Sequence, residues 1–373
     1  MTFPTLSYLT DIYFGFGSLK VLPELVKKYK ALRPLIITDK GLVKLGILEK
    51  LGTATKFVFD NVGTNPTEAM VLEAVEVYRK SGCDVIVSVG GGSPIDLAKC
   101  VGILVNHAPP LEQYAILRNG TSRITANMPP IIAIPTTAGS GSEVGRAALV
   151  TVEGVGKLGF LSNYLLPSAT ICDPELTIEL PPLLTAGTGM DAISHCVETF
   201  CSPRYNPVAD AIALDGLERG YRNLIKATSC GTDRQARTEM MMCSLQGGLA
   251  FQKGLGAVHS LSHPLGGLTV KQLHHGTLNA IFLPFVMRFN FDYCKEKMTS
   301  IADRLKIKKA SELPDRFALL NKELGLPVQL RELGLTREDL EPLANKAKED
   351  HCTPTNPRPL EAVDCLQLYR EAW

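Results

Sequence analysis

The first half of the chain alternates short β-branched runs with helix-like segments, and no other feature restricts the possible folds as strongly. Residues 67–82 carry apolar residues at helical spacing and end on Gly82, a typical helix C-cap. The expected strands cover residues 35–39, 56–60, 84–90, 131–135 and 169–172. This alternation predicts an α/β domain whose parallel sheet is built from βαβ units.

The sequence pattern changes at about residue 178, beyond which segments typical of β-strands become rare. Residues 184–200, 206–225 and 233–252 have the pattern of long helices. A chain of 373 residues fits two domains of about 100–200 residues each. We therefore expect an α/β domain over residues 1–178 and an all-α domain over residues 179–373.

Composition excludes several classes of partner. The 39 basic residues nearly balance the 38 acidic ones, which leaves a net charge of +1 and no surplus for binding nucleic acid. No run approaches the roughly 18 apolar residues of a membrane span, and the N-terminus has no signal-peptide pattern. The ten cysteines form no CxxC pair and are expected to be small buried side chains. We expect a cytoplasmic protein that binds neither nucleic acid nor membranes.

A glycine-rich turn, Gly90–Ser93, joins one expected strand to a helix with Pro94 at its first position. Glycines let the backbone approach a pyrophosphate closely, and a helix N-terminus offers unpaired N–H groups. The motif is neither GxGxxG nor a P-loop, because Lys99 lies well inside the helix. It predicts a phosphate cradle; the alternative is a tight turn with no ligand.

A second loop, residues 135–145, also follows an apolar strand and offers four hydroxyl groups. They belong to Thr136, Thr137, Ser140 and Ser142. Because ligands of open α/β sheets bind beyond the carboxyl ends of the strands, the two loops are expected to converge. Asp39 ends another strand, where a carboxylate accepts bonds from ribose hydroxyls and repels a 2′-phosphate. This favours NAD over NADP.

Five of the seven histidines fall between residues 195 and 275. Asp191 and His195 are one helical turn apart, and His259 and His263 repeat that spacing. His274 and His275 point about 100° apart on a helix, so at most one of them is expected to reach a shared ion. A carboxylate with imidazoles suits Fe²⁺, Zn²⁺ or another divalent ion. Taken singly, such an aspartate is more often a helix cap and such a histidine a hydrogen-bonding group.

The ordered motifs resemble those of the iron-containing (group III) alcohol dehydrogenases over nearly the whole chain. They are GGGSPIDLAK, PTTAGSGSEV, CDPELT, TGMDAISHCVE, HSLSHPLGG and HHGTLNA. The resemblance implies an active site between the two domains, NAD and a divalent metal as cofactors, and an alcohol or aldehyde substrate. Fe²⁺ is the expected ion, with Zn²⁺ as the alternative, and a homo-oligomer (dimer or larger) is expected.

The resemblance also implies roles for individual residues. The metal ligands would be Asp191, His195, His259 and His275, the last because the family's HGxxNA segment matches His275, Gly276, Asn279 and Ala280. His263 would be a non-ligand near the nicotinamide that assists proton transfer, and the ribose of the bound nucleotide is the alternative route for the proton. The cofactor contacts would be Asp39, Asn65, Gly91, Gly92, Ser93, Thr136, Thr137, Ser140 and Lys157.

Arg146 departs from the family pattern, because many relatives carry a small residue at this position. An arginine beside the expected nicotinamide loop can bind a carboxylate in bidentate fashion, which predicts an acidic substrate. Four segments, including EVGRAAL, are particularly similar to the 4-hydroxybutyrate dehydrogenases, which interconvert 4-hydroxybutyrate and succinate semialdehyde. Alternatively, Arg146 pairs with a protein carboxylate or the cofactor phosphates.

Three other functions remain open at this point. The chain would also suit a general dehydrogenase of short-chain alcohols or of another anionic hydroxy compound. A metal-dependent lyase of the dehydroquinate synthase type has a similar fold, but its phosphorylated substrate calls for a Lys/Arg cluster that is missing from the second half. A protein that binds nucleotide or metal without turnover is the third alternative.

Overall fold

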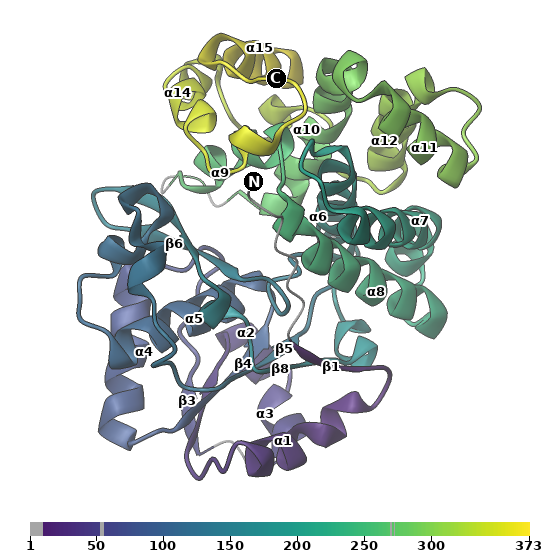
Figure 1. The fold of residues 1–373 in the computed structure, drawn as a ribbon. Helices are drawn as coiled ribbons and strands as arrows, with labels where there is room; N and C mark the ends of the chain where they lie inside the picture. The colour runs from purple at the N-terminus through teal and green to yellow at the C-terminus, as the bar shows by residue number, and fades with distance from the viewer. Residues whose placement is uncertain (1–9, 53–55, 269–270, 272) are drawn as a thin grey trace. The chain divides into compact units, whose positions relative to one another are not determined.

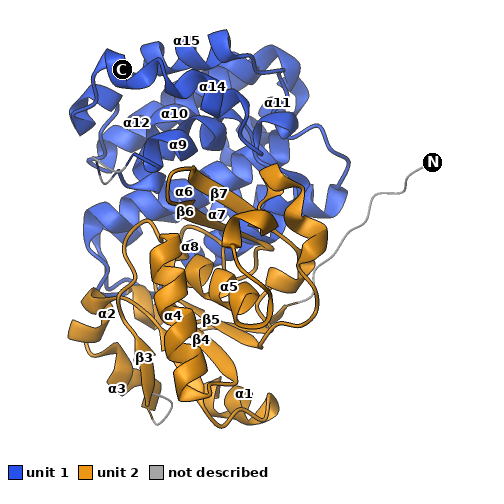
Figure 2. Ribbon diagram, turned by 90° about the vertical axis from the view of Figure 1, so that its left-hand side faces the viewer, with its two compact units in different colours: residues 1–7, 178–373 blue, residues 8–177 orange. Residues whose placement is uncertain are grey.

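The computed structural model describes residues 10–52, 56–268, 271 and 273–373, and it divides into two compact units (Figure 2). One unit comprises residues 8–177, and Ile178–Trp373 belong to the other. The sequence placed this division after residue 178. Each unit has its own architecture.

Six parallel strands form the sheet of the first unit, in the order β1-β8-β5-β4-β2-β3. They are β1 (Asp11–Phe14), β2 (Pro34–Ile37), β3 (Phe57–Phe59), β4 (Val85–Gly90), β5 (Ile131–Pro135) and β8 (Ala169–Cys172). All five predicted strands are present. The edge strand β1 and an antiparallel hairpin of β6 (Ala147–Val152) and β7 (Gly156–Leu161) were not anticipated.

Helices cover both faces of this sheet (Figure 1). They are α1 (Leu22–Lys28), α2 (Lys40–Lys44), α3 (Ile47–Leu51), α4 (Glu68–Ser81) and α5 (Gly92–Asn106). Alternate residues of a strand point to opposite faces of the sheet. Ile86 belongs to the hydrophobic core beneath α4 and α5, whereas Val85 and Val87 belong to the core beneath α1 and α3. Gly82 ends α4 with a φ of 60°, as the predicted C-cap requires.

The second unit is helical, as predicted. Its helices are α6 (Pro182–Cys201), α7 (Pro207–Ser229), α8 (Arg234–Ala250), α9 (Ala257–Gly266), α10 (His275–Asn290), α11 (Lys295–Leu305), α12 (Leu313–Glu323), α13 (Arg337–Leu340), α14 (Leu343–Lys348) and α15 (Ala362–Ala372). Asn206 caps α7 and Asp233 caps α8 through their side chains. Within the described residues, no helix is both long and apolar enough to cross a membrane. Nine of the ten cysteines are buried, and all ten are free thiols.

Candidate functional site

The predicted cofactor residues of the first unit follow the carboxyl ends of three adjacent strands. β4 lies between β2 and β5 in the sheet. Asp39 follows β2, Gly91 follows β4 and Thr136 follows β5, so the three segments share one edge. The Thr136 N–H donates to the Gly90 carbonyl at 3.0 Å. Parallel topology thus gathers segments that are about 50 residues apart in sequence.

The glycine-rich turn packs directly against the second loop. A Cβ at Gly91 would lie 3.2 Å from Thr137 Oγ1, and one at Gly92 would lie 2.9 Å from Ser140 Cβ. Gly90 has a φ of 150°, which other residues rarely adopt. Because the N-cap Gly91 has no side chain, it cannot cap the first N–H groups of α5. The two predicted loops therefore converge, and they leave little room for a side chain at Gly91 or Gly92.

The other predicted cofactor residues are held by local contacts. Ser93 Oγ donates to the Thr64 carbonyl at 2.5 Å, which ties the segment containing Asn65 to the glycine turn. Asp39 Oδ1 accepts the Leu42 N–H at 2.9 Å and so caps α2. Lys157 lies on β7, in the hairpin that follows the second loop.

The buried side chain of Lys99, for which the sequence predicted no role, joins the second loop to α5. Lys99 Nζ donates to the carbonyls of Ser142, Gly145 and Ala147 at 2.7–2.8 Å. Burial lowers the pKa of Lys99 to about 8, although Asp96 and Glu143 oppose this shift. Arg146 lies between two of these anchored carbonyls, and its Nη1 donates to Asn163 Oδ1 at 3.3 Å. Its backbone is therefore fixed.

In the second unit, the predicted metal ligands converge on one carboxylate oxygen. The Nε2 atoms of His259 and His275 lie 3.7 Å from Asp191 Oδ1, and that of His195 lies 3.8 Å from it. The side chains of Asp191, His195 and His259 are at most 7% exposed, whereas that of His275 is 28% exposed. One carboxylate and three imidazoles thus share a buried site with one more accessible side.

Helix packing explains how residues from three helices meet. Asp191 and His195 lie one turn apart in the interior of α6, so Asp191 is not an N-terminal cap. His275 is the first residue of α10, which crosses α6 at very short range. A Cβ at Gly276 would lie 2.2 Å from the Gly187 carbonyl oxygen, so only glycine permits the approach that brings His275 to Asp191.

The donor set fits a divalent cation. Burial raises the pKa of Asp191, but the charges of His195 and His275 outweigh it, and the net pKa lies well below its usual range. Asn279 Nδ2 donates to Asp191 Oδ1 at 2.7 Å and also lies 3.2 Å from His259 Nε2 and 3.1 Å from His275 Nε2. An amide nitrogen carries only two hydrogens for these three acceptors. The surrounding atoms therefore favour positive charge.

The remaining histidines of the cluster have different partners. His263 Nδ1 lies 2.9 Å from Asp350 Oδ2, and burial lowers the pKa of His263 to about 4 despite that carboxylate. The His263 ring stacks on those of His275 and His351, with centroids 5.4 and 5.3 Å apart. His274 instead caps α10, its Nδ1 accepting the Thr277 N–H at 3.3 Å.

Three residues at this site were not identified from the sequence. They are Asn279, Asp350 and Glu198, whose Oε2 lies 2.5 Å from His259 Nδ1. Glu198 could have been suspected, because it lies seven residues after Asp191 and three after His195 on one helix face. Asp350 gave no comparable signal, because it lies 87 residues from His263.

Comparisons with known proteins cover both units. Residues 10–174 match the family profile "Iron-containing alcohol dehydrogenase", and residues 185–373 match "Fe-containing alcohol dehydrogenase family, C-terminal". The chain is 47% identical to a 4-hydroxybutyrate dehydrogenase from Cupriavidus necator, over 98% of each chain. The fold is similar to that of a 1,3-propanediol oxidoreductase, with a TM-score of 0.93, 36% identity and coverage of 99% of this chain and 100% of the other. It is also similar to sulfoacetaldehyde reductase from Bifidobacterium kashiwanohense in complex with NAD+, with a TM-score of 0.89, 27% identity and coverage of 100% and 99%.

Proposed function

Because this chain belongs to the iron-containing alcohol dehydrogenase family, we propose that it interconverts an ω-hydroxy acid and its aldehyde with NAD, 4-hydroxybutyrate being the leading candidate. The family uses NAD and a divalent metal, so the chain is an oxidoreductase of that class. The observation that carries the substrate assignment is the 47% identity, over nearly the full length of both chains, to the Cupriavidus necator enzyme. A homo-oligomer stays a prediction.

We assign the metal site to Asp191, His195, His259 and His275. Their convergence within 3.8 Å of one carboxylate oxygen supports this assignment. A divalent ion supplies Lewis acidity that lowers the pKa of an alcohol. Fe²⁺ is the expected ion and Zn²⁺ the alternative, since both suit mixed nitrogen and oxygen ligands.

We assign dinucleotide binding to the edge formed by Asp39, Gly91 and Thr136. The bare N-terminus of α5 suits a pyrophosphate, and the contacts of Gly91 and Gly92 with the second loop leave no room for side chains there. The remaining assigned contacts are Asn65, Gly92, Ser93, Thr137, Ser140 and Lys157. The carboxylate of Asp39 disfavours a 2′-phosphate, which supports NAD over NADP.

We assign proton transfer to His263. With its Nδ1–H donated to Asp350, the neutral ring presents the Nε2 lone pair as a proton acceptor. Stacking on His275 and His351 holds the ring plane. We therefore propose that the hydroxyl proton of the alcohol leaves through His263 Nε2, with the ribose of the bound nucleotide as the alternative route.

We assign recognition of the substrate carboxylate to Arg146. The three carbonyls bound by Lys99 fix the backbone on both sides of Arg146, and the planar guanidinium is suited to bidentate recognition of a carboxylate. The sulfoacetaldehyde reductase with a similar fold is named for a substrate that is also an anionic aldehyde.

A substrate panel tests the reaction and its specificity together. The purified enzyme, loaded with Fe²⁺ or Zn²⁺, is assayed with 4-hydroxybutyrate, 1-butanol and 1,3-propanediol, each with NAD+ and NADP+. The highest kcat/KM is expected for 4-hydroxybutyrate with NAD+. A higher kcat/KM for 1,3-propanediol would indicate that the substrate is a neutral diol and not an ω-hydroxy acid. A preference for NADP+ would exclude the proposed role of Asp39 in selecting NAD.

The Arg146→Ala variant tests the carboxylate contact separately. It is expected to lose far more kcat/KM on 4-hydroxybutyrate than on 1-butanol. Arg146→Lys keeps the charge but not the bidentate geometry, so its kcat/KM on 4-hydroxybutyrate is expected to lie between those of wild type and Arg146→Ala. Equal losses on both substrates would exclude a carboxylate role for Arg146.

A further inference from the structure

Glu198 holds the side of His259 that faces away from the proposed metal site. It is 5% exposed on α6, and its Oε2 lies 2.5 Å from His259 Nδ1. The other nitrogen of that ring, Nε2, lies 3.7 Å from Asp191 Oδ1. The imidazole of His259 therefore bridges two carboxylates carried by the same helix.

The contact between Glu198 and His259 decides which nitrogen of the ring is available to a metal. A carboxylate accepts hydrogen bonds but does not donate them, so the Nδ1–H of His259 donates to Glu198 and Nε2 is the nitrogen that remains available to a metal. Carboxylates that bind the second nitrogen of a ligating histidine fix its tautomer and orientation and raise its basicity. The corresponding contact of His275 Nδ1 is with an uncharged hydroxyl, Ser262 Oγ, at 3.5 Å.

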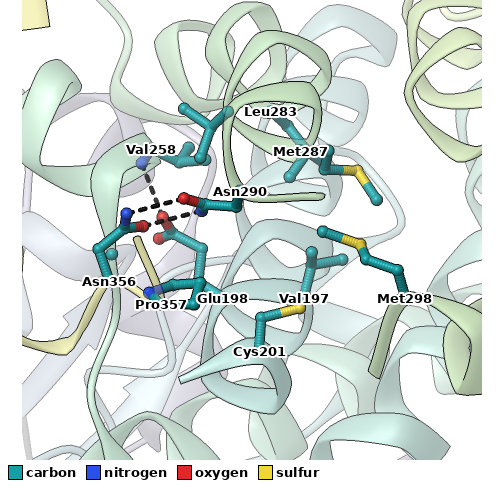
Figure 3. Close-up of a pocket in the computed structure, with 12 residues that line it drawn as sticks. Val197, Glu198, Cys201, Val258, Leu283, Met287, Asn290, Met298, Asn356 and Pro357 are labelled. Atoms are coloured by element: carbon teal, nitrogen blue, oxygen red, sulfur yellow. Dashed lines mark hydrogen bonds between the residues drawn. The ribbon is translucent and has the colours of Figure 1, made fainter. Parts of the chain in front are cut away.

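Glu198 is itself held at the N-terminus of α9. Its Oε1 accepts the Val258 N–H at 2.6 Å, while Asn356 Oδ1 accepts the neighbouring Ala257 N–H at 3.0 Å. Asn356 and Asn290 exchange two amide hydrogen bonds of 2.8 and 2.9 Å (Figure 3). Glu198 thus caps the helix that carries His259, where the helix dipole favours a negative charge.

The space beside the Glu198 carboxylate is small. A cavity of about 10 Å³ adjoins it, bounded on one side by the two asparagines and on the other by apolar side chains such as Met287 and Met298 (Figure 3). This volume admits at most about one water molecule. With so little room for water beside it, the carboxylate is expected to keep its bonds to His259 and the α9 backbone.

We propose that Glu198 is a positioning residue that fixes His259 for metal coordination and thereby sets how tightly the site retains its divalent ion. The proposal rests on the assignment of His259 as a ligand. It goes beyond that assignment, because it makes metal affinity depend on a residue that is not itself a ligand.

The test measures Zn²⁺ affinity rather than turnover. The protein loaded with Zn²⁺ is titrated with a chromophoric chelator, and the Kd is compared for wild type, Glu198→Gln and Asn290→Ala. Glu198→Gln preserves the shape but not the charge, and it is expected to weaken Zn²⁺ binding by about 10–100-fold. Asn290→Ala breaks the amide pair behind Glu198 and leaves both contacts of Glu198 in place, so its Kd is expected to stay near that of wild type. Thermal melting of the metal-free proteins reports folding.

A double-mutant cycle distinguishes an effect of Glu198 that is transmitted through His259 from a general destabilisation of the metal site. Adding Glu198→Gln to His259→Ala is expected to weaken Zn²⁺ binding no further than His259→Ala alone. Adding it to His275→Ala is expected to weaken Zn²⁺ binding by the same factor as in the wild-type protein. An unchanged Kd in Glu198→Gln, an equal loss in Asn290→Ala, or a full additional loss in the His259→Ala background would each overturn the proposal. If His259→Ala itself binds Zn²⁺ like wild type, the ligand assignment fails instead.

Discussion

The two candidate sites of this protein are built in opposite ways. The nucleotide edge of the α/β unit is built mainly from backbone, and glycines occupy the places where the two loops touch. The candidate metal site of the helical unit, Asp191, His195, His259 and His275, is built from side chains on α6, α9 and α10, and neighbours such as Glu198 and Asn279 hold some of them. The first site therefore depends on residues that lack a side chain, and the second depends on neighbouring residues that hold its side chains in place.

The largest expected effect comes from removing one side chain of the metal cluster. His259→Ala removes the imidazole nitrogen beside Asp191, and the variant is expected to lose both its bound metal after desalting and its turnover. Metal analysis and an alcohol oxidation assay on the same preparation measure this. Full activity without bound metal would exclude the assignment of this cluster as the catalytic metal site.

Adding a side chain to the nucleotide edge is the converse experiment. Gly92→Ala places a Cβ 2.9 Å from Ser140 Cβ, a clash that costs about 1–3 kcal/mol. The KM for NAD+ is expected to rise by about tenfold or more, since about 1.4 kcal/mol is a factor of ten. Metal content should not change.

Gly102→Ala, on the same helix, is the control for this experiment. Its new Cβ would meet the flexible end of Met128, so the KM for NAD+ is expected to stay close to that of wild type. If both variants bind NAD+ like wild type, the glycine turn is only a tight turn between β4 and α5.

A buried acid in the second loop predicts a pH dependence specific to the α/β unit. Burial raises the pKa of Glu143 from 4.5 to about 7, although Lys99 opposes this shift. Between these values the folded state binds more protons than the unfolded state, so the stability contributed by Glu143 falls as pH rises from about 4.5 to 7. At about 1.4 kcal/mol per pKa unit, the upper limit of this loss is roughly 3 kcal/mol.

Glu143→Gln removes that dependence and is expected to gain stability over wild type between pH 5 and pH 8. Thermal and urea unfolding of the metal-free and NAD-free proteins at both pH values measures the difference. The exposed Glu175→Gln serves as the control and should follow wild type. A constant difference between wild type and Glu143→Gln at the two pH values would contradict the prediction.

The smallest expected effect distinguishes two adjacent histidines. His274→Ala removes the cap of α10 and is expected to cost about 1 kcal/mol of stability with no loss of bound metal. Equilibrium unfolding and metal analysis measure these two quantities. Metal loss in this variant as large as in His259→Ala would place His274 in the metal cluster.

Local patterns allowed much of the fold to be predicted, and less of each site. The strand at 84–90 and the helix at 67–82 were predicted correctly because hydrophobic period and caps act over a few residues. The hairpin of β6 and β7 was missed, as was the edge strand β1, which pairs with β8 more than 150 residues away. Pairing between distant segments, as between β1 and β8, leaves no periodic signal in either one; β6 and β7 are adjacent in sequence, and this reason does not apply to them.

The histidine pairs illustrate the same limit. One-turn spacing places His259 and His263 on one helix face, but only His259 Nε2 faces Asp191, while His263 Nδ1 faces Asp350. The rotation of α9 against its neighbours decides this, and it depends on contacts such as that of Glu198 with Val258. Spacing therefore identified the candidates without dividing them between roles.

The sequence by itself determined which chemical groups are available: a glycine turn between a strand and a helix, a cluster of histidines, and one unusual arginine. The first two follow from residue type and local spacing, which act within a few residues along the chain, whereas the arginine is unusual only in comparison with the family it resembles. Only the tertiary structure decided that Gly187 and Gly276 let α6 and α10 approach closely enough to join His275 to Asp191, and that Glu198 and Asp350 each hold one histidine. Such contacts join residues 61 to 89 positions apart, and they form because packed helices leave each buried polar atom few partners.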